Sequence, residues 1–114
     1  MVSVPAFLTP AERAALEVFV DRARAMLGPE LREVRLFGSR ARGEGDEESD
    51  LDVALVVSEA GRQMRRSVYD LAFDVGASFG VEIAPLVIES ERLNALRQRE
   101  RLLAQDLDRE GIPL

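Results

Sequence analysis

The sequence predicts an α+β fold in which helices form a second layer against a small mixed β-sheet. Segments with apolar residues at helical spacing alternate along the chain with short segments rich in β-branched residues. The apolar fraction of 46% and the charged fraction of 32% are typical of a folded globular protein. A length of 114 residues matches one domain of common size, so we expect residues 1–114 to form a single domain.

The first helix is predicted for residues 10–27 and has signals for both of its ends. Thr9 can serve as the N-cap, Pro10 occupies the first helical position, and Glu12 completes a capping box. Apolar residues then recur with a period of about 3.6, and a Gly-Pro pair ends the helix.

Two short strands are predicted next. Residues 34–37 combine β-branched and aromatic side chains and stop at Gly38. Residues 51–57 are almost continuously apolar, which indicates that both faces of this strand are covered. We therefore expect the second strand to lie in the middle of the sheet.

The second half of the chain is predicted to add a helix, a strand and a further helix. Apolar residues at helical spacing define a helix over residues 61–79, which Gly80 closes. Residues 81–88 form a third strand, in which Pro85 indicates an edge position or a break in the hydrogen-bond ladder. Leucines at helical spacing outline a last helix over residues 90–111.

Composition excludes several kinds of chemistry. The chain has no Cys and no His, which excludes disulfides, zinc sites built on these residues, histidine-dependent triads and imidazole bases. All 15 basic residues are Arg, which excludes a Walker-type lysine. A net charge of −6 and a pI near 4.7 disfavour bulk nucleic-acid binding. No apolar run suits a membrane span and no export signal is evident, so we expect a cytoplasmic protein.

The first candidate binding segment follows the strand predicted for residues 34–37. Gly38 allows the backbone to approach a ligand closely, and Ser39 offers a hydroxyl group. If the chain opens a short helix here, free N–H groups can hold an anion, with Arg40 and Arg42 as charge partners. A Gly-Ser pair after a strand is common, so a plain turn is the alternative.

Two carboxylates begin the strand at residues 51–57. Asp50 and Asp52 are two residues apart, so both side chains point to the same face of the strand. Such carboxylates repel each other unless a cation lies between them, and Mg²⁺ accepts these ligands together with water and phosphate oxygens. The alternative is an exposed acidic strand end that continues the acidic loop at residues 44–48. That alternative does not account for the apolar run after Asp52.

Taken together, these residues resemble the nucleotidyltransferase superfamily that includes polymerase β. Its pattern is a hydrophobic residue, Gly, then Gly or Ser, about ten further residues, and an Asp-hydrophobic-Asp triplet. Residues 37–39 (FGS) and 50–52 (DLD), with ten residues between them, match this pattern. The segments GSRARG and SDLD are most similar to the branch of minimal nucleotidyltransferases. The resemblance covers nearly the whole chain and implies a polymerase β-like nucleotidyltransferase core.

The resemblance implies a site for metal and nucleotide. Asp50 and Asp52 would bind two Mg²⁺ ions, and Glu82 would complete the metal site and help to take a proton from the acceptor hydroxyl. Four residues would contact the nucleotide: Gly38, Ser39, Arg40 and Arg42. For Glu82 the alternative is an edge-strand charge that prevents aggregation. For the arginines the alternative is ion pairing on the surface, for example with the acidic loop.

The resemblance also implies a function. Minimal nucleotidyltransferases typically pair with an all-helical HEPN protein as the antitoxin of a toxin–antitoxin module, and some transfer AMP from ATP to that partner. The expected partners are therefore ATP or another NTP and a HEPN-type protein, with a homodimer as a further option. Two alternatives stay open: an antitoxin that acts by contact without turnover, and a nucleotidyltransferase with a small-molecule acceptor.

Overall fold

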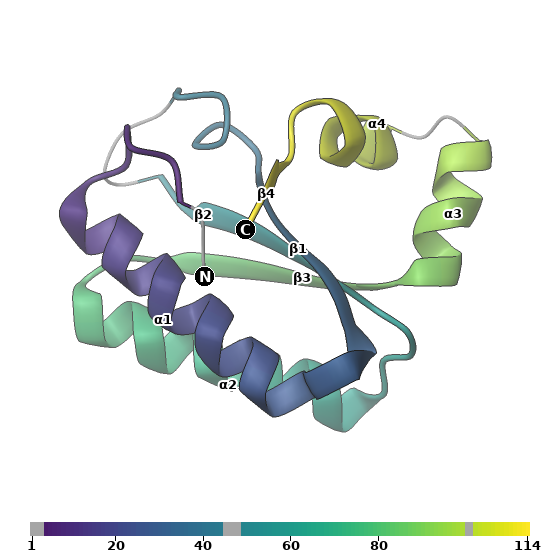
Figure 1. Cartoon of the computed structure of the whole chain (residues 1–114), viewed down its shortest axis with the longest axis horizontal. Coiled ribbons are helices and arrows are strands. Elements are labelled where there is room, and N and C mark those ends of the chain that lie inside the picture. Colours follow the sequence, from purple (N-terminus) through teal and green to yellow (C-terminus); the bar gives the residue numbers. More distant parts are fainter. Residues whose placement is uncertain (1–3, 45–48, 100–101) are drawn as a thin grey trace.

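A four-stranded sheet with the strand order β3-β2-β1-β4 organises the residues that the computed structural model describes, namely 4–44, 49–99 and 102–114 (Figure 1). The strands are β1 (Leu31–Phe37), β2 (Leu51–Val57), β3 (Ile83–Glu89) and β4 (Ile112–Pro113). β1 pairs antiparallel with β2 and β4, whereas β2 and β3 run parallel. The predicted mixed sheet is confirmed, and β2 lies inside it as expected.

Helices cover both faces of this sheet (Figure 1). The described residues form α1 (Pro10–Leu27), the short 3₁₀ helix η1 (Gly28–Glu30), α2 (Arg62–Phe79), α3 (Ser90–Gln98) and α4 (Leu102–Arg109). α1 and α2 pack against one face, and α3 and α4 lie on the other. The predicted α+β fold is therefore confirmed, but helices lie on both faces of the sheet, so there are three layers where two were predicted. No helix in the described part of the chain is long and apolar enough to cross a membrane.

The two faces of β2 contribute to different parts of the core. Alternate side chains of a strand point to opposite faces of the sheet. Side chains at positions 51, 53, 55 and 57 join the large cluster with α1 and α2. Ala54 and Val56 pack in the smaller cluster with α3 and α4. Asp52 shares the face of Ala54, so the alternation decides on which side of the sheet its carboxylate lies.

α1 has the predicted bounds and the predicted start. The Oε1 atom of Glu12 accepts a hydrogen bond from the N–H of Thr9 at 2.8 Å, and the Oγ1 atom of Thr9 accepts one from the N–H of Glu12 at 3.1 Å. These bonds satisfy N–H groups that the start of a helix leaves without partners. The capping box expected from the sequence is thus confirmed.

β3 begins two residues later than predicted and, as Pro85 indicates, lies at an edge of the sheet. The N–H of Leu51 donates to the carbonyl of Glu82 at 2.9 Å, so alternate residues of β3 counted from Glu82 face β2. Pro85 therefore directs its nitrogen toward the open edge, where the described residues supply no further strand. A proline in this position costs no ladder hydrogen bond.

The helix predicted for residues 90–111 is instead the pair α3 and α4 followed by β4. Residues 100–101, inside the predicted helix, lie outside the described residues. Arg97 and Asp108 show why one helix is wrong. Their side chains are 2.7 Å apart, whereas residues eleven positions apart in a continuous helix are separated by about 16 Å along its axis. The chain changes direction between α3 and α4, which the spacing of leucines could not reveal.

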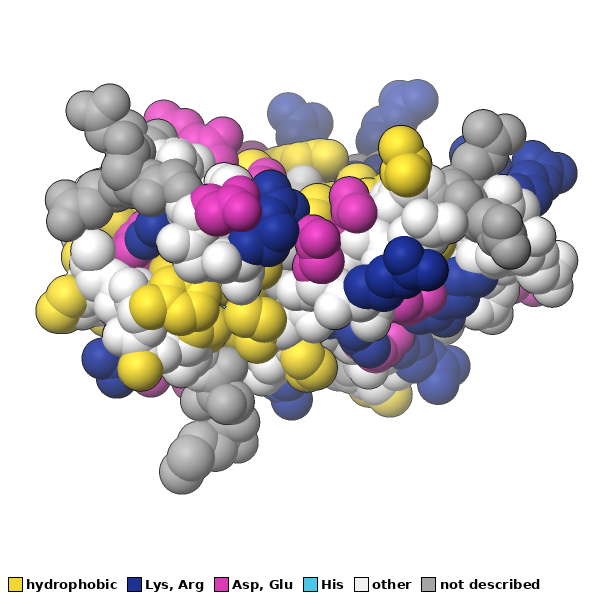
Figure 2. All heavy atoms as spheres, turned by 90° about the horizontal axis from the view of Figure 1, so that it is seen from above, with side chains coloured by type: hydrophobic (Ala, Val, Ile, Leu, Met, Phe, Trp, Pro, Cys, Tyr) yellow, Lys and Arg dark blue, Asp and Glu magenta, His cyan; other side chains and the backbone are white. Residues whose placement is uncertain are grey.

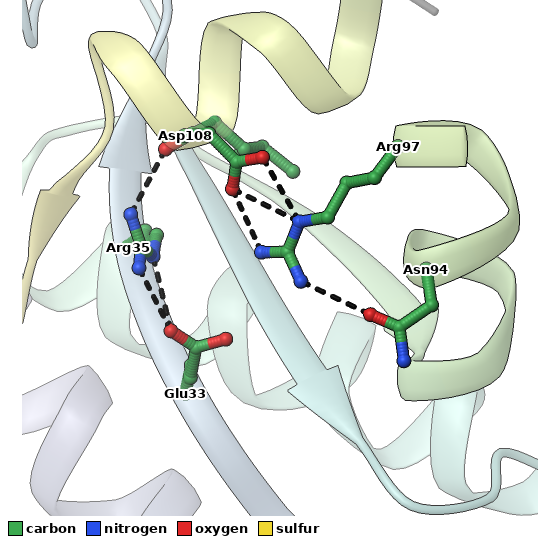
Figure 3. Close-up of polar contacts among 6 residues, drawn as sticks. Glu33, Arg35, Asn94, Arg97 and Asp108 are labelled. Atoms are coloured by element: carbon green, nitrogen blue, oxygen red, sulfur yellow. Dashed lines mark hydrogen bonds and ion pairs between the residues drawn. The ribbon is translucent and has the colours of Figure 1, made fainter. Parts of the chain in front are cut away.

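Charged side chains fix α4 to its neighbours (Figure 3). The Nη1 atom of Arg35 on β1 donates to the carbonyl of Leu107 at 3.0 Å, and its Nη2 atom pairs with Glu33 at 2.8 Å. Arg97 on α3 donates to Asp108, and this hydrogen bond lowers the pKa of the Asp108 carboxyl. The hydrogen bond from Arg35 therefore attaches α4 to β1. β1 itself begins three residues earlier than predicted.

Gly76 brings α2 close to the chain that leads into β3. A Cβ at this position would lie 2.5 Å from the carbonyl oxygen of Val81, and the N–H of Val81 donates to the carbonyl of Gly76 at 3.0 Å. We expect Gly76→Ala to destabilise the fold by about 1–3 kcal/mol, because backbone must move to make room and this outweighs the better helix propensity of alanine. Urea unfolding measures the difference.

Gly61→Ala is the matched control. Gly61 is the exposed N-cap of α2, and nothing lies within 4 Å of an added Cβ. We expect this change to cost at most about 1 kcal/mol, because alanine is a poorer N-cap than glycine but meets no steric clash here. Equal losses in the two variants would contradict a steric cause at Gly76.

Candidate active site

The register of three strands brings most of the predicted site residues to one end of the sheet, at the left of Figure 1. Asp52 lies opposite Phe37 in the antiparallel pair of β1 and β2, so the end of β1 meets the start of β2. β3 starts beside β2, with Ile83 opposite Leu51. Four predicted residues are gathered in this way: Gly38, Asp50, Asp52 and Glu82.

Gly38 is required at the end of β1 for two structural reasons. Its φ angle is 77°, in the left-handed region that favours glycine. A Cβ at this position would also collide with the Oδ2 atom of Asp52. The backbone of Gly38 and the carboxylate of Asp52 are therefore in direct contact, and any side chain would separate them.

The segment after Gly38 forms successive turns and not the short helix that the sequence suggested. The N–H of Ala41 donates to the carbonyl of Gly38 at 3.1 Å. The N–H groups of Arg42 and Glu44 both donate to the carbonyl of Ser39, at 3.2 and 2.9 Å. The loop thus folds back on itself and holds Ser39 beside the end of β1.

Arg40 anchors this loop to α1. Only 6% of the residue is exposed, its Nη2 atom is 2.6 Å from the Oε1 atom of Glu12, and its Nη1 atom donates to the carbonyl of Glu44 at 3.3 Å. A nucleotide contact by Arg40 is not supported, because its guanidinium is enclosed and engaged by a carboxylate. The sequence pattern predicts Glu12 only as part of the helix cap. Its pairing with Arg40, 28 residues away in the chain, has no local sequence signal.

Arg42 lies on the surface and forms ion pairs, which were the predicted alternative to a nucleotide contact. Its guanidinium is 2.9 Å from Glu110 and 3.2 Å from Glu44, and its hydrogen bonds to these two carboxylates raise the pKa of Arg42. Arg42 thereby links the loop to the turn before β4. Residues 45–48, which make up most of the acidic loop, lie outside the described residues. A nucleotide contact by Arg42 stays a prediction.

The three carboxylates affect one another's protonation. Burial and the negative charge of Asp50 raise the pKa of Asp52. Glu82 is exposed, and a hydrogen bond with Asp50 together with the charge of Asp50 raises the pKa of Glu82. Glu82 therefore faces Asp50, as expected for a β3 strand in matching register with β2.

This set of oxygen ligands fits a hard divalent cation in its chemistry. Carboxylates are the protein ligands that Mg²⁺ prefers, and a bound cation reverses the repulsion that raises their pKa values. Among the described residues, no group of three His, Cys, Asp or Glu side chains is already arranged to hold a metal ion. Metal binding would therefore require the side chains of Asp50, Asp52 and Glu82 to move into a ligating arrangement.

The face seen from above carries both signs of charge (Figure 2). Acidic and arginine side chains lie next to one another there, among apolar side chains, and the coloured residues form no continuous basic surface. A polyanion approaching this face would meet acidic groups as well as basic ones.

Comparison with known proteins identifies the class. The family model described as the nucleotidyltransferase domain matches residues 16–107, which is most of the chain. That range contains Gly38, Asp50, Asp52 and Glu82. The chain therefore belongs to the nucleotidyltransferase domain family.

Individual relatives confirm the expected resemblance to the minimal nucleotidyltransferases. A solved structure provisionally described as a minimal nucleotidyltransferase is 30% identical, with a TM-score of 0.61, over 93% of this chain and 97% of that one. A chain from the complex of the tri-AMPylated HEPN toxin of Shewanella oneidensis with its MNT antitoxin is 14% identical, with a TM-score of 0.51, over 90% of this chain and 70% of that one. The second likeness shows the fold alone.

One curated relative also matches. A Methanocaldococcus jannaschii protein provisionally named a protein adenylyltransferase is 26% identical over 82 residues, which is 69% of this chain. The chain spans 56%, about half, of the length of that relative. The activity of the whole relative therefore enters only as support for a proposal.

Asp52→Asn is expected to stabilise the protein when neither metal nor nucleotide is bound. Burial and the charge of Asp50 raise the pKa of Asp52, so its ionised form destabilises the fold at pH 7. The neutral amide removes this cost, and the Tm should rise by about 2–4 °C. The gain should vanish as the pH falls through the raised pKa, because the wild-type carboxyl is then neutral as well. Differential scanning calorimetry measures both effects.

Asp108→Asn is the matched control and should have the opposite sign. The hydrogen bond from Arg97 lowers the pKa of Asp108, so the ionised carboxylate stabilises the fold at pH 7. This stabilisation is lost only as the pH falls below the ordinary range of an Asp and through the lowered pKa. If the Tm of Asp52→Asn lies below that of the wild type, the charge of Asp52 is compensated in the folded protein and the prediction for this residue is wrong.

Glu12→Gln is expected to weaken the anchor of the loop. Burial raises the pKa of Glu12, but hydrogen bonds from Thr9 and Arg40 and the charge of Arg40 outweigh burial and lower it. The variant leaves a buried guanidinium without its counter-charge, at a cost of about 2–4 kcal/mol in urea unfolding. The double variant Glu12→Gln/Arg40→Met should lose less than the sum of the two single changes. Additive losses would mean that the two side chains act independently.

Proposed function

We propose that the protein transfers AMP from ATP to a hydroxyl group on a partner protein, with Mg²⁺ as its cofactor. The observation that carries this proposal is the gathering of Asp50, Asp52 and Glu82 at the strand ends beside Gly38. Family membership supports nucleotidyl transfer. The names of two relatives, a protein adenylyltransferase and an antitoxin bound to an AMPylated toxin, support AMP and a protein acceptor.

The site residues have distinct tasks in this reaction. Asp50 and Asp52, with Glu82, would hold one or two Mg²⁺ ions, which supply charge neutralisation at the triphosphate. Gly38 and Ser39 hold the β- and γ-phosphates. The acceptor oxygen bonds to the α-phosphorus, the bond from that phosphorus to the bridging oxygen breaks, and pyrophosphate leaves. Glu82 is exposed, so it can take the proton of an acceptor that arrives from outside.

The two arginines contribute in different ways. Arg40 acts as a positioning residue, since its ion pair with Glu12 keeps Gly38 and Ser39 in place. Arg42 is exposed and can exchange a carboxylate partner for a phosphate oxygen.

The acceptor in this proposal is a HEPN-type protein, with this chain as its antitoxin. The support is the Shewanella oneidensis complex of a HEPN toxin with an MNT antitoxin, of which the matched chain is covered to 70%. ATP and a protein partner of this kind are both met in the cytoplasm, which is the location that the proposal implies.

Labelling with ATP that carries a radioactive α-phosphate tests the proposal. The protein, Mg²⁺ and labelled ATP are incubated with an extract of the source organism, in parallel with Asp52→Asn. We expect a protease-sensitive labelled band with the wild type, and at least about 100-fold less label with the variant, because a ligand of the metal is lost. Chelation of Mg²⁺ should remove the label as well.

Asp108→Asn is the control, because it makes the same chemical change outside the site and should label the band like the wild type. An RNase-sensitive band would replace the protein acceptor with RNA, and a labelled small molecule would favour the second enzyme alternative. If the wild type gives no more label than Asp52→Asn, transfer is contradicted, and an unlabelled protein that copurifies would then indicate an antitoxin acting by contact.

A further inference from the structure

A groove of about 590 Å³ lies between α2 and the edge strand β3. Its lining includes Tyr69, Phe73, Gly76, Gly80, Glu82 and Pro85. Two of these residues are glycines without side chains, which leaves space between the helix and the strand. Beyond β3 no further strand closes the groove in the described part of the chain.

Two aromatic side chains are exposed along this groove. Phe73 is 76% exposed and Tyr69 is 49% exposed. They are four residues apart on α2, so they are neighbours on one face of the helix. Neither belongs to the two core clusters. Neighbouring exposed aromatic residues beside a groove are typical of a surface that contacts another protein.

The charge of the groove restricts what it can hold. Glu82 is the one charged side chain among the ten described residues that line it, and the chain carries a net charge of −6. Phosphate groups and a second copy of this chain would both be repelled. An apolar protein segment with Lys or Arg beside it would be attracted.

Glu82 connects the groove with the candidate active site. Asp52 lies on the face of the sheet that α3 and α4 cover, whereas the groove lies beside α2. Glu82, directly before the edge strand, lines the groove, and its carbonyl accepts a hydrogen bond from the N–H of Leu51, the residue next to Asp50. A molecule in the groove can therefore bring a group to Glu82 from the side of α2, while a nucleotide is held from the other side.

We infer that this groove is the docking surface for the acceptor protein, and that it binds an apolar segment flanked by Lys or Arg. The inference rests on the proposed function and names where its second substrate binds. Apolar side chains of the acceptor pack on Phe73 and Tyr69, and the acceptor hydroxyl lies next to Glu82. Its oxygen then forms the bond to the α-phosphorus, Glu82 receives the proton, and pyrophosphate leaves.

Phe73→Ser tests the inference without threatening the fold, because the side chain is largely exposed. We expect the rate of labelling of the acceptor protein to fall by about tenfold or more, as for the loss of a central aromatic contact. The affinity for a non-hydrolysable ATP analogue with Mg²⁺, measured by calorimetry, should change by less than about twofold. Phe7→Ser is the matched control: Phe7 is 50% exposed but does not line the groove, so this variant should label like the wild type.

The outcomes separate the inference from the proposed function. Equal labelling by Phe73→Ser and the wild type would overturn the docking surface and leave the proposed function standing. A weaker affinity for the ATP analogue would make the groove a nucleobase site, which also overturns it. If the wild type labels no protein, the proposed function fails and the docking surface fails with it.

A photoreactive side chain gives a direct readout of what occupies the groove. Benzoylphenylalanine introduced in place of Phe73 should crosslink to the same protein that becomes labelled, as identified by mass spectrometry. The same side chain introduced in place of Phe7 should not. A crosslink to a second copy of this chain, or to a protein other than the labelled one, would overturn the inference.

Discussion

The position of β2 between β1 and β3 is the constraint on which the rest of the structure depends. β2 places Asp52 opposite Phe37 in the antiparallel pair and Leu51 opposite Ile83 in the parallel pair. Because side chains alternate between faces, a shift of β2 by one residue would turn Asp52 into the core and Leu51 out of it. The apolar side chains that β2 buries under α1 and α2 oppose this shift. Hydrophobic burial therefore fixes the register that places the carboxylates at the strand ends. Contacts among the site residues are not needed to fix it.

Two acidic side chains with arginine partners have lowered pKa values, whereas two carboxyl groups at the site have raised ones. Glu12 is buried and Asp108 is exposed, but each has an arginine partner, and each has a lowered pKa. At the strand ends, burial and the charge of Asp50 act on Asp52, and contact with Asp50 acts on Glu82, so that both pKa values are raised. A cluster that lowers stability in this way is typical of a functional site, where a ligand supplies the missing charge.

The two faces of the sheet are covered unequally, and this difference separates the two substrates in our proposals. α1 and α2 have 18 residues each and bury the larger core, whereas α3 and α4 have nine and eight and leave Asp50 exposed. The edge strand β3 borders both faces of the sheet. Because Pro85 has no N–H group, the open edge of β3 lacks one of the hydrogen-bond donors that a further strand would need. Glu82, which directly precedes this strand, is exposed and lines the groove beside α2, so in our proposals the acceptor reaches it from that side.

Local signals were sufficient for the helix over residues 10–27 and the strand over residues 51–57, because capping, helical periodicity and a continuous apolar run act over a few residues. The glycine turn and the aspartate pair could be found from their spacing, since each lies next to a strand that is itself predictable. The tertiary structure alone decided that Arg40 is enclosed by Glu12 and that Glu82 faces Asp50. It also decided that the last predicted helix is two helices and a strand. These features depend on contacts between residues far apart in the chain, and the free energy of such contacts leaves no periodic trace in the sequence.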